Sequence, residues 1–222
     1  MAVLNKLLLA FVLLVATPLA LHGAVYWSEP QAHNWSAADW SSAGLLPPAR
    51  EHREAVVRIY SARTGAWKGM FATHTWIVLK ETGAPDYERW DKVGWGSPIR
   101  RNHRAPDGRW YGHDPDVVYA ADGAAAERLI PRLRAGIAAY RFRAAGDYRV
   151  WPGPNSNTFV AAVLAAVPEI GTASSIAVMR RASPCLRTGS QVRSCSTHTL
   201  PSRSIDCTVY GSQCRPSFAI VW

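Results

Sequence analysis

The segment from Trp151 to Phe159 is the strongest candidate for chemistry in the chain. It reads Trp-Pro-Gly-Pro-Asn-Ser-Asn-Thr-Phe and leads into a run with apolar residues at helical spacing. A helix N-terminus has free N–H groups and a partial positive charge, so it stabilises the anion that forms when a nucleophile attacks. Ser156 is therefore a candidate nucleophile. The alternative is a plain helix cap, in which Asn155 accepts a bond from a first-turn N–H and Ser156 and Asn157 are early helix positions.

His74 is the candidate partner of Ser156, because it lies in a predicted strand whose other residues are mostly apolar, aromatic or β-branched. A histidine close to the hydroxyl would act as the general base during its attack. The alternative is a buried histidine that a neighbouring hydrogen bond satisfies and that has no chemical role.

The other candidate ligands do not form a metal or cofactor site. His113, Asp114 and Asp116 follow no standard ligand spacing, and all four cysteines lie in residues 171–222. We therefore expect neither a metal nor a cofactor. The basic loop Arg100–Arg104, continued by Arg109, is either a solvated surface or a contact with anionic lipid headgroups.

The net charge of +9 is uneven along the chain, since residues 171–222 hold six arginines and one acid. Residues 1–170 are close to balanced, and no nucleic-acid recognition motif accompanies the basic tail. We therefore expect no nucleic-acid partner.

Strands must position His74. Four segments have the alternation and the β-branched or aromatic content of strands: residues 55–60, 70–80, 87–95 and, as a short edge strand, 117–119. Their spacing predicts an antiparallel meander, interrupted by a loop or hairpin excursion over residues 97–115.

Helices follow the strands. Apolar residues at spacings of three and four predict one helix up to Tyr140, with Asp122 as its cap and with Pro131 kinking it or dividing it in two. The same pattern predicts a second helix from Ser156 to Val167. Strands followed by helices predict an α+β domain, with two helices on one face of an antiparallel sheet.

The N-terminus predicts a hydrophobic helix that meets a membrane. The 22 residues from Leu7 to Ser28 carry no formal charge, and about 20 apolar residues span a bilayer. We expect a signal anchor in residues 1–28, with a cleaved signal peptide and secretion as the alternative. Lys6 precedes the run, which predicts a body outside the cytoplasm, in the periplasm or at the cell surface.

The remaining organisation is a connector over residues 29–50, a single domain over 51–170 and an atypical basic tail over 171–222. The tail is rich in arginine, serine and cysteine and lacks a helical period. It is expected to be either disordered or an out-of-frame reading of the gene.

Three segments resemble a bacterial family called domain of unknown function 3750: Trp40–Pro47, Phe71–Lys80 and Trp151–Phe159. The resemblance covers residues 38–170. It implies an uncharacterised protein of the bacterial envelope and brings no activity with it.

A more distant resemblance concerns the order of the candidate residues. A strand histidine followed by Asn-Cys-Asn at a helix start is similar to circularly permuted papain-like folds, relatives of the NlpC/P60 hydrolases. This implies a papain-like arrangement with His74 as base and Ser156 at the place of the cysteine. A serine needs a base during attack and a formed oxyanion hole, because its hydroxyl cannot be kept ionised as a thiol can. Asp91 on the following strand is the candidate for orienting His74.

Three functions remain open at this point. The first is a serine-variant hydrolase or acyl-transfer enzyme acting on an amide or ester. The second is a non-catalytic envelope module that binds a peptide or glycan through Asn155, Asn157, Trp76 and Trp151. The third is a structural membrane-surface protein.

Overall fold

The computed structural model describes residues 2–29, 32 and 34–170. The predicted tail, residues 171–222, lies outside the described residues. Three helical segments come first, followed by strands and then helices: α1 Ala2–Phe11, the π-helical η1 Val12–Ala16, α2 Thr17–Ser28, β1 Val56–Arg63, the 3-10 helix η2 Ala66–Met70, β2 Thr73–Lys80, β3 Glu88–Lys92, β4 Ile99–Arg101, β5 Asp116–Asp122, α3 Gly123–Ala139 and α4 Ser156–Leu164.

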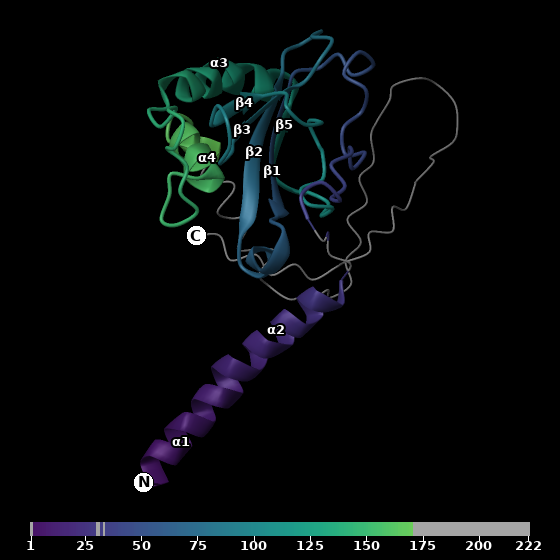
Figure 1. Ribbon diagram of the computed structural model, residues 1–222. Coiled ribbons are helices and arrows are strands. Elements are labelled where there is room, and N and C mark those ends of the chain that lie inside the picture. Colours follow the sequence, from purple (N-terminus) through teal and green to yellow (C-terminus); the bar gives the residue numbers. More distant parts are fainter. Residues whose placement is uncertain (1, 30–31, 33, 171–222) are drawn as a thin grey trace, which may run out of the picture.

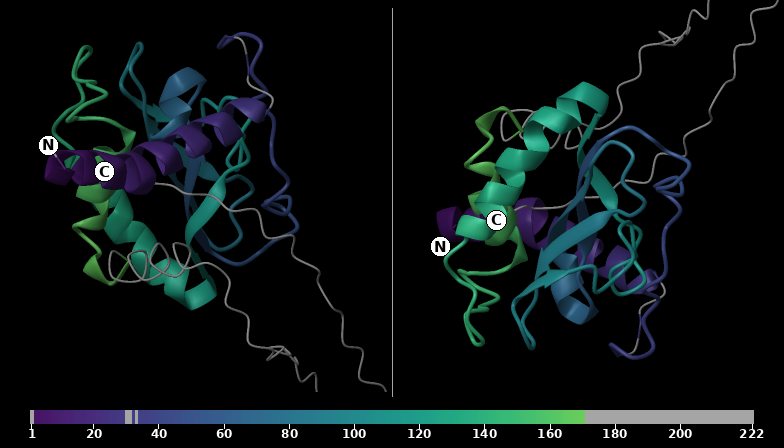
Figure 2. Two further views of the ribbon diagram at one scale, coloured as in Figure 1. Left: turned by 90° about the horizontal axis from the view of Figure 1, so that it is seen from below. Right: turned by 90° about the horizontal axis from the view of Figure 1, so that it is seen from above.

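One antiparallel sheet has the strand order β4-β3-β2-β1-β5. The helices α3 and α4 lie on one side of it, and the segment from about residue 35 to 50 lies on the other (Figures 1 and 2). The predicted α+β domain with two helices on an antiparallel sheet is therefore confirmed.

The sheet separates two hydrophobic cores, because successive side chains of a strand point to opposite faces. Ile77 and Leu79 of β2 belong to the core that α3 and α4 cover. Trp76 and Val78 belong to the second core, which Trp110 and the connector cover. The face on which a residue lies thus decides which elements it meets.

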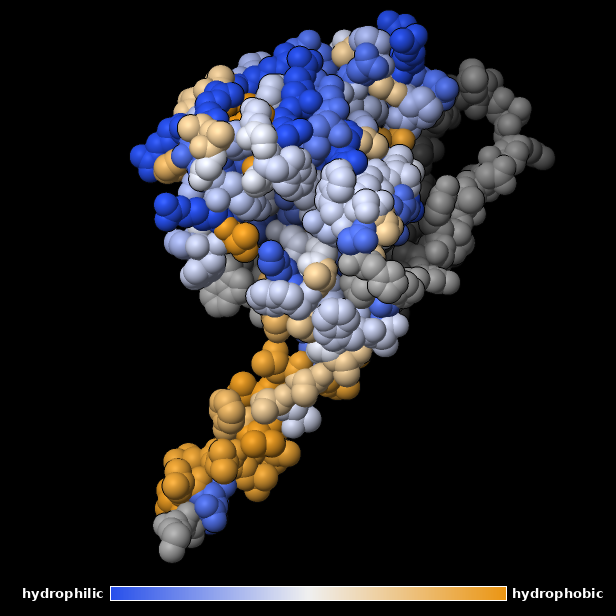
Figure 3. All heavy atoms as spheres, viewed as in Figure 1, coloured by the Kyte–Doolittle hydropathy of each residue, from blue (hydrophilic) through white to orange (hydrophobic). Residues whose placement is uncertain are grey.

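The predicted N-terminal hydrophobic helix is present. Residues Val3–Ser28 form one helix long and apolar enough to cross a membrane, as an anchor or a signal sequence would be. It projects away from the body and is largely hydrophobic on its surface, whereas the body is mostly polar (Figures 1 and 3).

The first body helix differs from its prediction at its N-terminus. Pro131 lies inside a single helix, which excludes only the alternative of two short helices, and Ile130 and Leu133 on either side are buried in the core. Asp122 occupies the N-cap position without making a side-chain cap bond. Its carboxylate instead pairs with Arg58 of β1 at 2.8 Å.

The limits of three other elements also differ. The loop over 97–115 contains β4, whose three residues owe their conformation to pairing with β3. β5 has seven residues because it pairs with β1 over most of its length. The last helix ends at Leu164 rather than at Val167.

Candidate functional site

The N-terminus of α4 is built as a capping box, in which two side chains satisfy two backbone N–H groups reciprocally. Asn155 Oδ1 accepts from the Thr158 N–H at 3.0 Å, and Thr158 Oγ1 accepts from the Asn155 N–H at 2.8 Å. Gly153 has a φ of +119°, which strains any residue with a Cβ. The predicted cap by Asn155 is confirmed, and it fixes where Ser156 begins the helix.

Ser156 is 2% exposed, and Tyr148 is its neighbour. Burial raises the pKa of Tyr148, and the neighbouring side chain and backbone of Ser156 partly offset this rise. Tyr148 therefore lies near the start of α4, whose free N–H groups an oxyanion formed at Ser156 would need.

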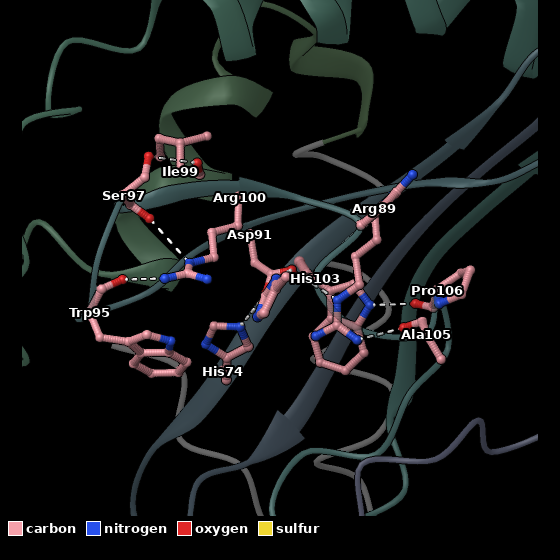
Figure 4. Close-up of polar contacts among 12 residues, drawn as sticks. His74, Arg89, Asp91, Trp95, Ser97, Ile99, Arg100, His103, Ala105 and Pro106 are labelled. Atoms are coloured by element: carbon pink, nitrogen blue, oxygen red, sulfur yellow. Dashed lines mark hydrogen bonds and ion pairs between the residues drawn. The ribbon is translucent and has the colours of Figure 1, made fainter.

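His74, Asp91 and Arg89 form a buried polar group on the opposite face of the sheet. His74 Nε2 lies 3.3 Å from Asp91 Oδ1, and Arg89 Nε donates to Asp91 Oδ2 at 2.9 Å. The Asp91 and Arg89 side chains are fully buried, and that of His74 is 3% exposed. Figure 4 shows the Asp91 carboxylate between His74 and Arg89, with His103 beside it at 3.6 Å.

The charges of Arg89 and Asp91 and the burial of His74 set the protonation states of these three residues. Burial raises the pKa of Asp91, but the Arg89 guanidinium, and after it the hydrogen bond from His74, lower it to about 2. Burial lowers the pKa of His74, although Asp91 opposes this effect. At neutral pH an ionised Asp91 therefore faces a neutral His74. Because a carboxylate only accepts, Nε2 carries the proton and Nδ1 keeps its lone pair, which is the tautomer of a base.

Aromatic rings enclose His74. Trp110 stacks on the imidazole with 3.6 Å between ring centroids and 5° between planes. Trp76 is fully buried, donates its indole N–H to the Pro106 carbonyl at 2.8 Å and carries the Arg89 guanidinium 4.1 Å over its ring. Trp95 is stacked on Trp110 and is 40% exposed. Access to His74 therefore requires movement of at least one of these rings.

Ser156 and His74 are not in contact, although the residues that follow them in the sequence are. Thr75 Oγ1 donates to Asn157 Oδ1 at 2.9 Å, which joins the residues directly after His74 and Ser156. Because Thr75 faces α4, its neighbour His74 points to the other face. Among the hydrogen bonds of the described residues none joins Ser156 to His74.

The other predicted site residues are separated. Trp151 is 71% exposed, and Asn157 bonds to Thr75 as above. A hollow of about 900 Å³ lies elsewhere, between the connector and the turn before β3, where Pro47, Tyr87 and Arg101 line it. Within residues 2–29, 32 and 34–170, no group of three or more His, Cys, Asp or Glu side chains is placed to hold a metal ion.

Three residues that shape the site are not predicted from the sequence. Arg89 is two positions before Asp91, a spacing that places both on one face of a strand and was available as a signal. Trp110 and Tyr148 come from loops without a period, so no pattern places them beside His74 or Ser156.

One family profile, described as a protein of unknown function (DUF3750), matches residues 54–181. The chain belongs to this family. No curated protein and no solved structure matches the chain. The DUF3750 match covers the whole described body from β1 onward, including His74, Asp91 and Ser156, whereas the papain-like resemblance gains no support from a solved structure.

Proposed function

We propose that this DUF3750 protein is an envelope enzyme that hydrolyses or transfers the acyl group of an amide or ester, with Ser156 as nucleophile. The observation that carries the proposal is the buried His74–Asp91 pair. A neutral imidazole held through Nε2 has its other nitrogen available to take a proton. Asp91 orients the ring and stabilises the imidazolium that forms.

The reaction then proceeds in two steps, through an acyl-serine intermediate. The Ser156 oxygen attacks the carbonyl carbon while His74 Nδ1 takes the hydroxyl proton. His74 returns that proton to the leaving amine or alcohol, which leaves an acyl-serine ester. Water, or an acceptor amine or alcohol, then attacks the ester by the same route and frees Ser156.

A change of conformation belongs to this proposal. The Ser156 hydroxyl must move away from its present surroundings and reach His74, which now lies on the opposite face of the sheet. Once Tyr148 withdraws, the backbone N–H groups at the start of α4 become available to the oxyanion.

The body lies outside the cytoplasm in this proposal, fixed to the membrane by residues 1–28, as the position of Lys6 predicts. The substrate is accordingly a component of the envelope, such as a peptide amide or a glycan ester. Reporter fusions after residue 170 test the orientation: activity of a periplasmic reporter supports it, and activity of a cytoplasmic reporter contradicts it.

A serine-reactive fluorophosphonate tests the chemistry without knowledge of the substrate. We expect it to label the full chain, and we expect Ser156→Ala and His74→Gln to abolish labelling. Ser61→Ala is the matched control, because Ser61 is another buried serine of the same body, on β1. Labelling that persists in Ser156→Ala would contradict the assignment.

The second candidate is a non-catalytic module that binds an envelope peptide or glycan. The burial of both Ser156 and His74 favours it, since neither is open to a substrate in this conformation. Absence of phosphonate labelling, together with retention of a peptidoglycan fragment by the folded chain, would favour this function over catalysis.

A further inference from the structure

The junction between α2 and η2 ties the N-terminal helix to the body. Tyr26 is 1% exposed, and its hydroxyl donates to the Ala66 carbonyl at 2.7 Å. One turn earlier, His22 Nε2 lies 2.9 Å from the Met70 carbonyl oxygen. A Cβ on Gly69 would lie 2.2 Å from the Tyr26 hydroxyl, so this close approach requires glycine.

An ion pair continues the junction past the end of the helix. Arg63 at the end of β1 pairs with Glu29 at 3.2 Å, and its guanidinium lies over the Tyr26 ring. The helix therefore contacts the body at several points over two turns.

Large apolar side chains stay exposed around this junction. Trp67 of η2 is 61% exposed and Phe71 directly after it is 39% exposed, while Val25 and Trp27 of α2 are each 54% exposed. The Phe71 ring lies 6.4 Å from that of His22, which puts the end of η2 at the level of the last turns of the helix.

The length of the helix places this level at a membrane surface. Residues Val3–Ser28 form a 26-residue apolar helix, whereas a hydrocarbon core of about 30 Å takes about 20 residues at 1.5 Å each. A span that begins at Leu7, directly after Lys6, reaches the interface near Tyr26, which bonds to Ala66 at the start of η2. Tryptophan and other aromatic rings are favoured at that depth.

We propose that η2, through Trp67 and Phe71, is a second membrane contact that lies in the headgroup layer of the bilayer that holds the uncleaved N-terminal helix. Lys68, exposed between them, suits anionic lipid headgroups. The occupant of this surface is lipid because the patch is continuous with the apolar helix itself. The proposal does not depend on Ser156 or His74.

Brominated lipids, which quench only nearby tryptophans, test this contact. The full chain is placed in phosphatidylcholine–phosphatidylglycerol nanodiscs with bromine either near the headgroups or near the bilayer centre. Wild type is compared with Trp67→Phe and with the control Trp90→Phe, whose half-buried ring lies on β3 under Arg101.

We expect headgroup-level bromine to quench part of the wild-type emission, and Trp67→Phe to reduce the quenched part. The control Trp90→Phe should leave the quenched part unchanged, and bromine near the bilayer centre should not quench the Trp67 component. An equal quenched part in wild type and Trp67→Phe would overturn the proposal. The proposal would also be overturned if mass spectrometry of the mature chain showed that the N-terminal helix had been removed.

Discussion

The substitution Asp91→Asn isolates the charge that organises the buried group on β2 and β3. Asparagine keeps the size of the side chain and removes its negative charge. Arg89, which is fully buried, then loses the carboxylate 2.9 Å from its Nε. Leaving one partner of a buried ion pair uncompensated costs about 3–5 kcal/mol.

The pKa of Asp91 supports a loss of similar size. Folding lowers this pKa from 3.8 to about 2, and each unit corresponds to about 1.4 kcal/mol. The charge therefore contributes about 2–3 kcal/mol to the free energy of unfolding. Because the folded-state pKa is the lower one, this contribution is complete above about pH 4 and is lost as the pH falls towards 2.

Urea unfolding of the full chain in detergent micelles, followed by tryptophan fluorescence, measures the effect. We expect Asp91→Asn to lose about 3 kcal/mol at pH 7 and to show a shallower decline of stability below pH 4. Asp86→Asn, an exposed carboxylate in the turn before β3, is the matched control and should stay within about 0.5 kcal/mol of wild type.

A double-mutant cycle with Arg89→Met decides whether the loss comes from this ion pair. The double variant should be more stable than the sum of the two single losses predicts, by at least about 1 kcal/mol. Strict additivity, or an Asp91→Asn loss below about 1 kcal/mol, would refute the reasoning.

Three further outcomes follow from the same contacts. Asn155→Ala should lower the free energy of unfolding by about 1 kcal/mol, because it removes the acceptor of the capping box, and urea unfolding would measure it. Burial, helped by nearby arginines and opposed by Asp91, lowers the pKa of His103 to about 4. The free energy of unfolding should therefore decrease as the pH falls from about 6.5 to 4, because the unfolded chain binds a proton at this histidine first. His103→Gln should make the free energy of unfolding less dependent on pH in that range. Tyr148→Phe should increase the rate of phosphonate labelling, because it removes the phenol hydroxyl next to Ser156, and an unchanged rate would mean that Tyr148 does not restrain Ser156.

The sheet could be predicted from the sequence because its central strands are rich in β-branched and aromatic residues. β1 and β2 have long runs of buried β-branched and aromatic residues, and their predicted ranges overlap most of the observed strands. β4 has only three residues and a polar sequence, so its conformation depends on β3, a partner that no local pattern identifies.

The candidate site could be predicted only in part. The pairing of His74 with Asp91 follows from neighbouring antiparallel strands, and the hydrogen bond between them is present. The sequence also predicts that His74 and Thr75 point to opposite faces of their strand. It does not predict which face α4 covers, because that depends on the tertiary fold. Trp110 comes from a loop whose place is set by Asp107, which accepts from Ser42 Oγ and the Leu45 N–H, and no short-range pattern encodes such a contact.

The most direct test of the central claim is the pH dependence of adduct formation at Ser156, with the modified peptide identified by mass spectrometry. Burial lowers the pKa of His74 below its ordinary value of about 6.5. If His74 is the base, the labelling rate should rise with pH, reach half its maximum below pH 6.5 and stay constant through neutral pH. A folded chain with no adduct at Ser156, or a rate that still rises above pH 8, would contradict the account.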